Sequence, residues 1–189
     1  MGRRSSIGEE DLIDALSRVF RDTGYEGATL SSLSQETGLQ RASLYHRFPG
    51  GKEQMAQEVL AATESWLAEN LFEPLKSDDP VDQRLQAMTR KLHKLYSGGK
   101  QACILNMLSS ASDGDSPFAE AIKRIFKALI DALAALAEER GFEQADARDR
   151  AERAVILLHG SLVLSRGTGT QRPFERFLET LPNELLGHR

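Results

Sequence analysis

Residues 29–52, TLSSLSQETGLQRASLYHRFPGGK, constrain the fold most strongly, because two short amphipathic segments here flank a tight turn. Leu30 and Leu33 share one face of the first segment, and the preceding Thr29 can cap its free N–H groups. Gly38 follows at the point where a helix commonly ends in a left-handed residue, a conformation that glycine adopts without strain. This pattern predicts two short helices joined by a turn, the arrangement known as a helix-turn-helix.

The second segment, residues 40–47, has one apolar and one polar face. Leu44 and Phe48 lie four residues apart and can be buried together, whereas the outward side chains can all form hydrogen bonds. In a helix-turn-helix the second helix enters the DNA major groove, although a solvated surface helix would carry similar residues. Lys52 opens the next helix, where an ammonium and a helix N-terminus together can seat a phosphate. The predicted DNA-binding residues are Thr29, Ser31, Gln40, Arg41, Ser43, Tyr45, His46 and Lys52.

A wider pattern surrounds this motif. Its members are Phe20, Gly24, Tyr25, residues 28–30, Gly38, Leu39, residues 44–48, Lys52 and Glu53. Together they resemble the N-terminal signature of TetR-type transcriptional regulators, and the run LYHRFPGGKE is most similar to the multidrug-regulator subset typified by LmrA. Two positions depart from the family pattern: Gln40 stands where the family often has Ser or Thr, and Ser31 stands where it often has Arg. Both differences bear on which operator sequence is read.

Charge and composition restrict the partners of the chain. Its 189 residues carry a formal net charge of −4, and the first 52 contain seven basic and seven acidic residues. A DNA reader with this balance must segregate its charges, and we expect modest, salt-dependent non-specific affinity. The single cysteine, Cys103, excludes an internal disulfide and suits a reducing cytoplasm. There is no apolar run of the ~18 residues that a membrane span needs and no signal-peptide core, so we expect a soluble cytoplasmic protein.

Helical periodicity continues through the rest of the chain, with glycine and proline only at plausible helix ends. We predict an all-α fold of about nine helices, with a helix-turn-helix domain over residues 1–51 and an effector-binding and dimerisation domain over 52–189. Arg3 and Arg4 lie in a terminal arm that either reaches DNA or has no role. The predicted helices span residues 9–23, 30–37, 40–47, 52–71, 81–96, 102–111, 118–140, 144–165 and a last segment after Pro173.

The resemblance implies a homodimer formed by the last two helices, and the apolar run in residues 154–165 is compatible with this. A dimer would read a pseudo-palindromic operator in double-stranded DNA. The middle helices would enclose a cavity for a small apolar effector, although a filled core is the favoured interpretation for each lining residue taken singly. The predicted effector-binding residues are Trp66, Met88, Leu92, Cys103, Asn106, Met107, Phe126 and His159.

Two other classes of protein have helical chains of this length. An enzyme is disfavoured because the four histidines show no metal-ligand spacing, and the chain has neither a phosphate-binding glycine loop nor a nucleophile elbow. We therefore expect no metal and no cofactor. A helical interaction protein, in which the helix-turn-helix serves only for packing, would show no salt-sensitive DNA binding. The favoured prediction is a DNA-binding regulator, a repressor that a small effector releases from its operator.

Overall fold

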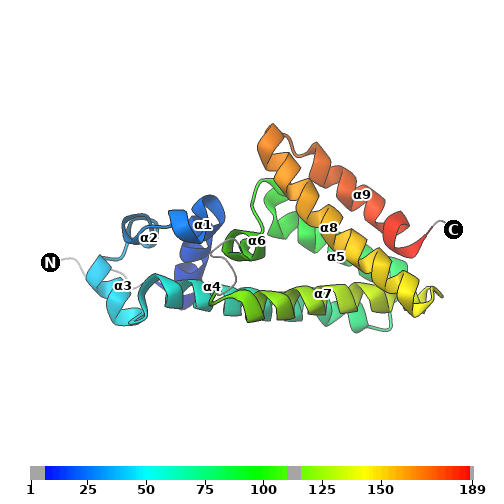
Figure 1. The fold of residues 1–189 in the computed structure, drawn as a ribbon, viewed down its shortest axis with the longest axis horizontal. Coiled ribbons are helices and arrows are strands. Elements are labelled where there is room, and N and C mark those ends of the chain that lie inside the picture. Colours follow the sequence, from blue (N-terminus) through cyan, green and yellow to red (C-terminus); the bar gives the residue numbers. More distant parts are fainter. Residues whose placement is uncertain (1–6, 110–115, 188–189) are drawn as a thin grey trace. The chain divides into compact units, whose positions relative to one another are not determined.

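The computed structural model describes residues 7–109 and 116–187, and within these ranges all regular structure is helical (Figure 1). The predicted all-α class is confirmed by nine α-helices in the described ranges, while Arg3 and Arg4 lie outside them. The α-helices are α1 Glu9–Gly27, α2 Leu30–Thr37, α3 Arg41–Arg47, α4 Gly51–Leu67, α5 Val81–Leu95, α6 Ile104–Ser109, α7 Ala119–Glu139, α8 Gln144–Thr168 and α9 Arg172–Leu186. Among the described residues, no helix combines the length and apolar character that crossing a membrane would require.

The chain forms two compact units. Of the described residues, the first contains those up to Thr63 together with 104–109 and 116–119, and the second contains residues 64–103 and 120–187. The compact units divide inside α4, which runs on without interruption past its first turn, and α6 belongs to the first unit. The functional boundary after residue 51 stays a prediction.

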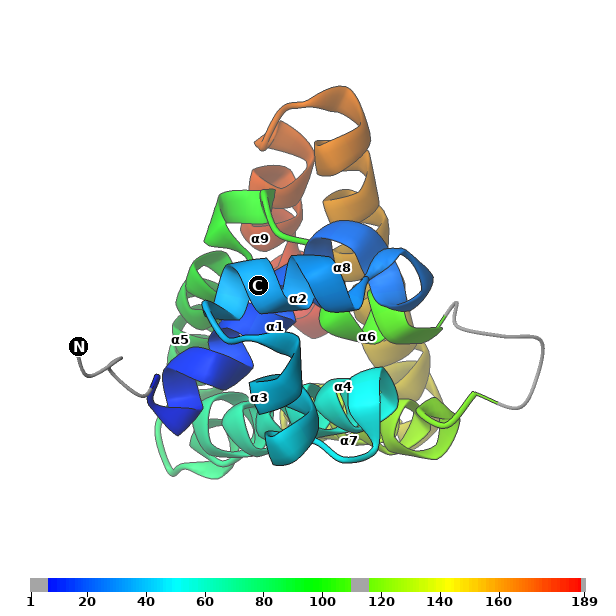
Figure 2. The same cartoon turned by 90° about the vertical axis from the view of Figure 1, so that its left-hand side faces the viewer.

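The first unit is built around α1. Leu16 and Phe20 on this helix are fully buried with Leu33 of α2 and Leu44 of α3. Gly24 takes a left-handed φ of +71° inside α1, so the helix bends at the residue where it was predicted to end and adds one more turn. Helices α2 and α6 both pack against α1, and Figure 2 looks onto the α1, α2 and α3 group. This packing leaves the outer face of α3 free.

The second unit contains α5, α7, α8 and α9. Helices α8 and α9 pack along one another (Figure 1), and a short 3-10 turn, Ser97–Gly99, lies against both. Gly99 permits this approach, since a Cβ added to it would lie only 2.7 Å from the Cβ of Phe174 on α9. Helix α7 is tied to its neighbours by ion pairs: Arg124 with Glu64, at 2.7 and 2.8 Å, and Arg140 with Asp82, at 3.1 Å. These contacts fix α7 laterally within the unit.

Two helix ends differ from their predicted positions. Helix α4 passes into a π-helical turn, Ala68–Phe72, and then a 3-10 turn, Pro74–Lys76. Helix α8 was predicted to end near residue 165, but it continues to Thr168 and is closed by Gly169 in the left-handed conformation, with φ at +69°. Gly167 is tolerated inside the helix because glycine weakens a helix interior by only about 1 kcal/mol relative to alanine.

Candidate nucleic-acid interface

The N-terminus of α2 is held by a reciprocal cap. The hydroxyl of Thr29 accepts a hydrogen bond from the Ser32 amide at 3.1 Å, and the Ser32 hydroxyl accepts one from the Thr29 amide at 3.1 Å. The predicted capping by Thr29 is therefore confirmed. The contribution of Ser32 was not predicted, because this position usually carries Glu or Gln in a capping box.

The turn between α2 and α3 is fixed by hydroxyl groups as well as by glycine. Gly38 is left-handed, with φ at +66°, as predicted. The Ser34 hydroxyl donates to the carbonyl oxygen of Leu39. The Thr37 hydroxyl donates to the Leu33 carbonyl at 2.7 Å and accepts from the Leu39 amide at 3.3 Å. These bonds set the direction in which α3 leaves the turn.

Helix α3 buries one side and exposes the other. Leu44 is completely buried and Phe48 is 5% exposed, which anchors the helix on the core. The predicted outward residues of this segment are all exposed, including Tyr45, an aromatic ring that is 48% exposed. These exposed residues are Gln40, Arg41, Ser43, Tyr45 and His46. Ala42, Ser43 and His46 also line a shallow groove of about 630 Å³ on this face. The outer face of α3 is therefore free to contact a partner.

Charged contacts limit the free positive charge around this face. Arg41 donates to the hydroxyl of Ser31 on α2, so two predicted DNA-binding residues already touch each other. Arg47 pairs with Glu9 of α1 at 2.9 Å. The expected segregation of charges is thus incomplete, because an α1 carboxylate offsets Arg47.

Lys52, which is predicted to seat a phosphate, has a partner within the chain. Its side chain is half-buried, its Nζ donates to the carbonyl oxygen of Tyr25 at 2.9 Å, and it lies 4.3 Å from the centre of the Tyr25 ring. The Tyr25 ring in turn packs edge-on against Phe118, with centroids 4.9 Å apart. Burial and the nearby carboxylates of Glu53 and Glu26 raise the pKa of Tyr25. The Lys52 ammonium thus joins α4 to the end of α1.

The predicted effector residues are divided between the two units. Asn106, which is exposed, and Met107, which is half-buried, belong to α6 in the first unit. In the second unit Met88, Leu92 and Cys103 are buried; the Cys103 Sγ lies 3.5 Å from the Tyr96 hydroxyl.

The remaining members of that set are half-buried. Phe126 and His159 pack edge-on against each other, with centroids 5.2 Å apart, and Trp66 lies near the end of α4. A cavity of about 690 Å³ in the second unit is lined by other residues, chiefly from α7 and the turns after α4. No group of three metal-ligating side chains occurs in the described part of the chain.

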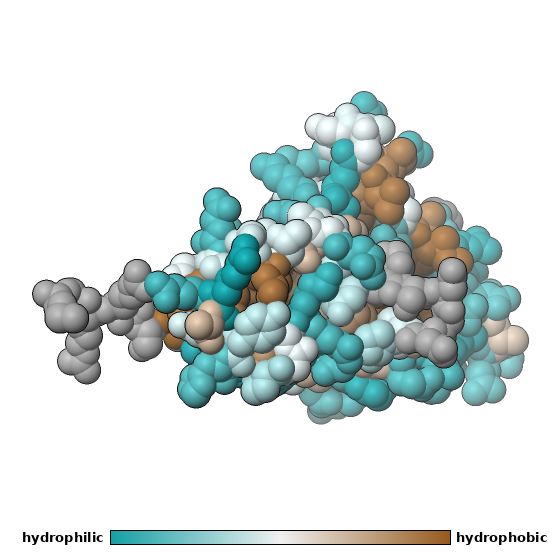
Figure 3. Space-filling view, turned by 60° about the vertical axis from the view of Figure 1, so that its left-hand side comes forward, coloured by the Kyte–Doolittle hydropathy of each residue, from teal (hydrophilic) through white to brown (hydrophobic). Residues whose placement is uncertain are grey.

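Helix α8 carries an exposed apolar surface, the α8 stripe, defined as Ile156, Leu157, Val163 and Leu164. These four residues are 69%, 39%, 57% and 55% exposed, and apart from Tyr45 they are the exposed large apolar side chains of the described residues. Figure 3 shows hydrophobic side chains at the surface in the upper right of the view, where α8 lies. Contiguous apolar side chains in water mark an interaction surface.

Sequence comparison identifies both parts of the chain. Residues 12–59 match the family of bacterial regulatory proteins called tetR, and residues 80–180 match the C-terminal domain of LmrA/YxaF-like transcriptional regulators. The chain is similar to the HTH-type transcriptional regulator LmrA of Bacillus subtilis, with 22% identity over 93% of this chain and 95% of that protein. It is also similar to the uncharacterised HTH-type transcriptional regulator YxaF of the same organism, with 26% identity over 92% of each.

Solved structures show the same fold. A TetR transcriptional regulator from Legionella pneumophila superposes with a TM-score of 0.83 at 19% identity, covering 97% of this chain and all of that one. A regulatory protein TetR from Rhodobacter sphaeroides gives a TM-score of 0.78 at 20% identity, covering 95% and 99%.

Proposed function

The chain belongs to the TetR family of bacterial regulatory proteins, with a C-terminal domain of the LmrA/YxaF-like type, and from this premise we propose that it is a dimeric repressor released by a small molecule. It is a transcriptional regulator with a helix-turn-helix DNA-binding domain. The proposal covers three points: the residues that read the operator, the surface that joins two copies, and the action of the effector.

Base reading is assigned to the outer face of α3. The supporting observation is that Leu44 and Phe48 anchor the helix while Gln40, Ser43 and His46 stay exposed. The amide of Gln40, at the N-cap position, forms no capping hydrogen bond and is available for a base edge. Glutamine pairs well with adenine in the major groove, where one good contact contributes about 1–3 kcal/mol of discrimination.

Four other residues take supporting roles in this proposal. Thr29 caps α2 and Lys52 links α4 to Tyr25, so both position the motif. Arg41 donates a hydrogen bond to Ser31, and we assign phosphate contact to this pair. Because phosphate contacts fix register and base contacts give specificity, losing a positioning residue should weaken binding to all DNA sequences alike.

A second copy of the chain is proposed to cover the α8 stripe. The stripe is apolar and exposed, and the dimers usual in this family pair their last two helices. Closed two-fold symmetry buries the same surface on both copies. Two recognition helices about 34 Å apart then reach successive major grooves, so the operator is a pseudo-palindrome.

The effector is proposed to act on the second unit. A molecule that binds one arrangement of the dimer better than another shifts the population toward it and changes the separation of the recognition helices. Coupling of about 1–3 kcal/mol, the usual range, lowers operator affinity roughly 5- to 150-fold. An effector that bound tightly and left operator affinity unchanged would contradict this mechanism.

Selection of binding sites from random DNA tests the base-reading role. The wild-type chain, Gln40→Ala and Gln57→Ala are compared; Gln57 is an exposed glutamine on α4, outside the motif, and serves as the matched control. We expect wild type and Gln57→Ala to select the same pseudo-palindrome and Gln40→Ala to lose preference at one symmetric pair of positions. Equal weakening on every DNA sequence by Gln40→Ala would refute base reading by this residue.

A further inference from the structure

The unit that carries the helix-turn-helix is acidic. Its described residues include nine carboxylate and five cationic side chains, which give it a net charge of −4. Duplex DNA presents one negative charge about every 1.7 Å along its axis, so a unit of this charge is repelled as a whole. DNA binding therefore depends on where the five cations lie and on what holds them in the free protein.

All five cations have a hydrogen-bond partner within the first unit. Three of them donate to a hydroxyl or carbonyl oxygen: Arg21, Arg41 and Lys52. The other two form ion pairs, Arg18 of α1 with Glu36 of α2 at 2.7 Å, and Arg47 of α3 with Glu9 of α1 at 2.9 Å. A carboxylate, unlike a hydroxyl or a carbonyl, cancels the charge of the cation that it holds. Arg18 and Arg47 are both held in this way.

Of these two ion pairs, that of Arg47 lies on the helix to which base reading is assigned. Arg47 is the last residue of α3, and it lines the shallow groove on the outer face of this helix together with Ser43 and His46. Arg18 lies on α1, and neither it nor Glu36 lines the groove. A duplex placed against the outer face of α3 therefore meets the ion pair of Arg47.

The contact between Glu9 and Arg47 is weak enough for a phosphate to replace it. The side chain of Glu9 is 84% exposed and that of Arg47 is 35% exposed, so water and salt screen their attraction. The Nη2 of Arg47 donates to the Oε2 of Glu9 at 2.9 Å, a contact at one point. A guanidinium can instead donate two parallel, charge-assisted hydrogen bonds to a phosphate. The C-terminal end of α3 also favours a cation when Glu9 is absent.

We propose that Arg47 binds a DNA phosphate, and that Glu9 occupies Arg47 in the free protein, so that a duplex must displace a carboxylate in order to bind. Because Glu9 lies in contact with Arg47, its freed carboxylate stays near the phosphate that replaces it and repels that phosphate. Glu9 therefore lowers affinity for all DNA sequences alike, and the base contacts of α3 still set the preference among them. This inference rests on the proposed function, which places the duplex on the outer face of α3.

Removal of the charge of Glu9 tests this exchange of partners on the full-length protein. Wild type, Glu9→Gln and Glu10→Gln are titrated by anisotropy against two labelled duplexes, one from upstream of the coding region and one of unrelated sequence. Glu10→Gln is the matched control, because it makes the same change of charge at the next, exposed residue of α1. At low salt, we expect Glu9→Gln to bind both duplexes about tenfold more tightly, and Glu10→Gln to stay within about threefold of wild type. Equal gains in the two variants would overturn the proposal.

Salt dependence distinguishes an exchange of partners from an ion pair that serves only the fold. In the wild type, Arg47 displaces a cation from the duplex, but the freed carboxylate of Glu9 attracts a cation in its place. The slope of log affinity against log salt concentration should therefore be steeper in Glu9→Gln, by up to about one unit per protomer. If the pair instead holds α3 against α1, Glu9→Gln should lower the urea midpoint and weaken binding to both duplexes, and that result refutes the exchange.

Substitution of Arg47 completes a double-mutant cycle. Arg47→Ala should weaken binding to both duplexes and make the salt slope shallower by about one unit per protomer, because a phosphate contact is lost. In the Arg47→Ala background, Glu9→Gln should give a smaller gain in affinity than it gives in the wild type, because no cation is left for the carboxylate to hold. A gain of the same size in both backgrounds would mean that Glu9 acts by general repulsion, and it would refute the exchange.

The two duplexes separate this inference from the proposed function. If the wild type binds both duplexes equally and Glu9→Gln binds both more tightly, operator reading at this locus is refuted and the exchange stands. If the wild type prefers the upstream duplex and Glu9→Gln shows no gain, the exchange alone is refuted. A preference for the upstream duplex that Glu9→Gln retains, together with a gain on both duplexes, supports both proposals.

Discussion

Substitution of Val163 by glutamate should separate the proposed dimer. Val163 is 57% exposed in the single chain, between Ile156 and Leu164, which are 69% and 55% exposed. Full burial of such a side chain contributes about 1.5–3 kcal/mol, so covering the exposed part contributes about 1 kcal/mol. Two-fold symmetry doubles this to about 2 kcal/mol, or a factor of roughly 30 in the dimer dissociation constant. Two unpaired carboxylates in an apolar interface add to the loss, so 30-fold is a lower estimate.

Sedimentation equilibrium over a range of concentrations measures this change directly, since the chain has a mass of 20.9 kDa and the dimer twice that. Ala145→Glu is the control, because it adds the same charge to an exposed position in the first part of α8. We expect wild type and Ala145→Glu to remain dimeric where Val163→Glu is monomeric. The variant should keep its helical circular dichroism, because Val163 is exposed and no residue of the α8 stripe belongs to the first unit. It should lose operator affinity, because a monomer presents only one recognition helix.

A wild-type chain that stays monomeric at all concentrations would refute the assignment of the α8 stripe. So would a Val163→Glu protein whose dissociation constant equals that of Ala145→Glu, because the interface would then lie elsewhere on the molecule.

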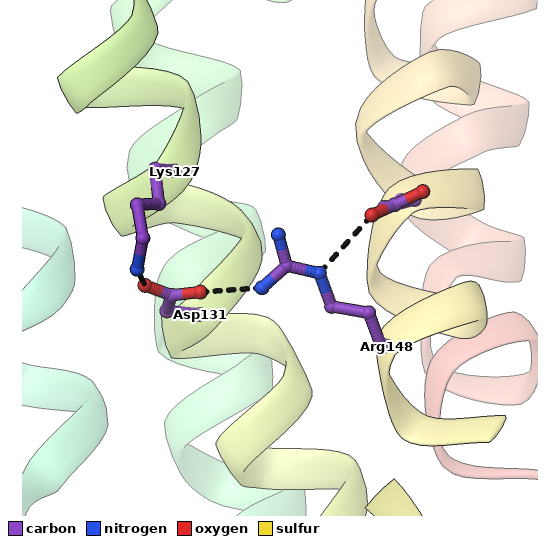
Figure 4. Close-up of polar contacts among 4 residues, drawn as sticks. Lys127, Asp131 and Arg148 are labelled. Atoms are coloured by element: carbon purple, nitrogen blue, oxygen red, sulfur yellow. Dashed lines mark hydrogen bonds and ion pairs between the residues drawn. The ribbon is translucent and has the colours of Figure 1, made fainter. Parts of the chain in front are cut away.

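Three further predictions follow from contacts within the units. Gly99→Ala places a Cβ 2.7 Å from that of Phe174 at a φ of +95°, and the clash and backbone strain should lower the free energy of unfolding by about 2–4 kcal/mol, measured with urea. Lys52→Ala removes the bond to the Tyr25 carbonyl, so it should lower the thermal midpoint and leave the salt dependence of operator affinity unchanged. If the slope of log affinity against log salt concentration became shallower by about one unit, Lys52 would instead contact a phosphate. The pKa of Asp131 is lowered by hydrogen bonds from Lys127 and Arg148 (Figure 4), so the charged carboxylate stabilises the fold above its ordinary pKa of about 4, and this stability is lost as the pH falls through the lowered folded value. The urea midpoint of Asp131→Asn should therefore change less with pH below about pH 4 than the midpoint of the wild type. A variant whose midpoint depends on pH as the wild type does would contradict the assigned pair.

The helices and the turn of the DNA-binding motif were predictable because local rules determine them. Apolar periodicity located α2 and α3, and Gly38 adopts the left-handed conformation that its position requires. The anchoring of α3 by Leu44 and Phe48 followed from their spacing. Such features depend on residues close together in the chain, where helix periodicity and capping are read directly.

Contacts between distant residues were not predictable in the same way. Lys52 is a residue type that commonly binds phosphate. Its 2.9 Å hydrogen bond to the carbonyl of Tyr25, 27 residues earlier, exists only because the fold brings the two residues together. The effector residues were chosen for polarisable or aromatic side chains, whereas the cavity is formed by alanines of α7 and by turns whose π-helical geometry no sequence pattern indicated. Empty space depends on which side chains are too small to fill it, and that is decided by packing between helices.

The measurement that tests the central claim most directly is fluorescence anisotropy of the purified protein on DNA from immediately upstream of its own coding region, with unrelated DNA as the control and salt varied. A sequence-reading dimer should prefer the upstream fragment by about 1,000-fold or more and lose affinity steeply as salt rises. Equally weak binding to both fragments, with no preference at any salt concentration, would contradict operator reading at this locus by the outer face of α3.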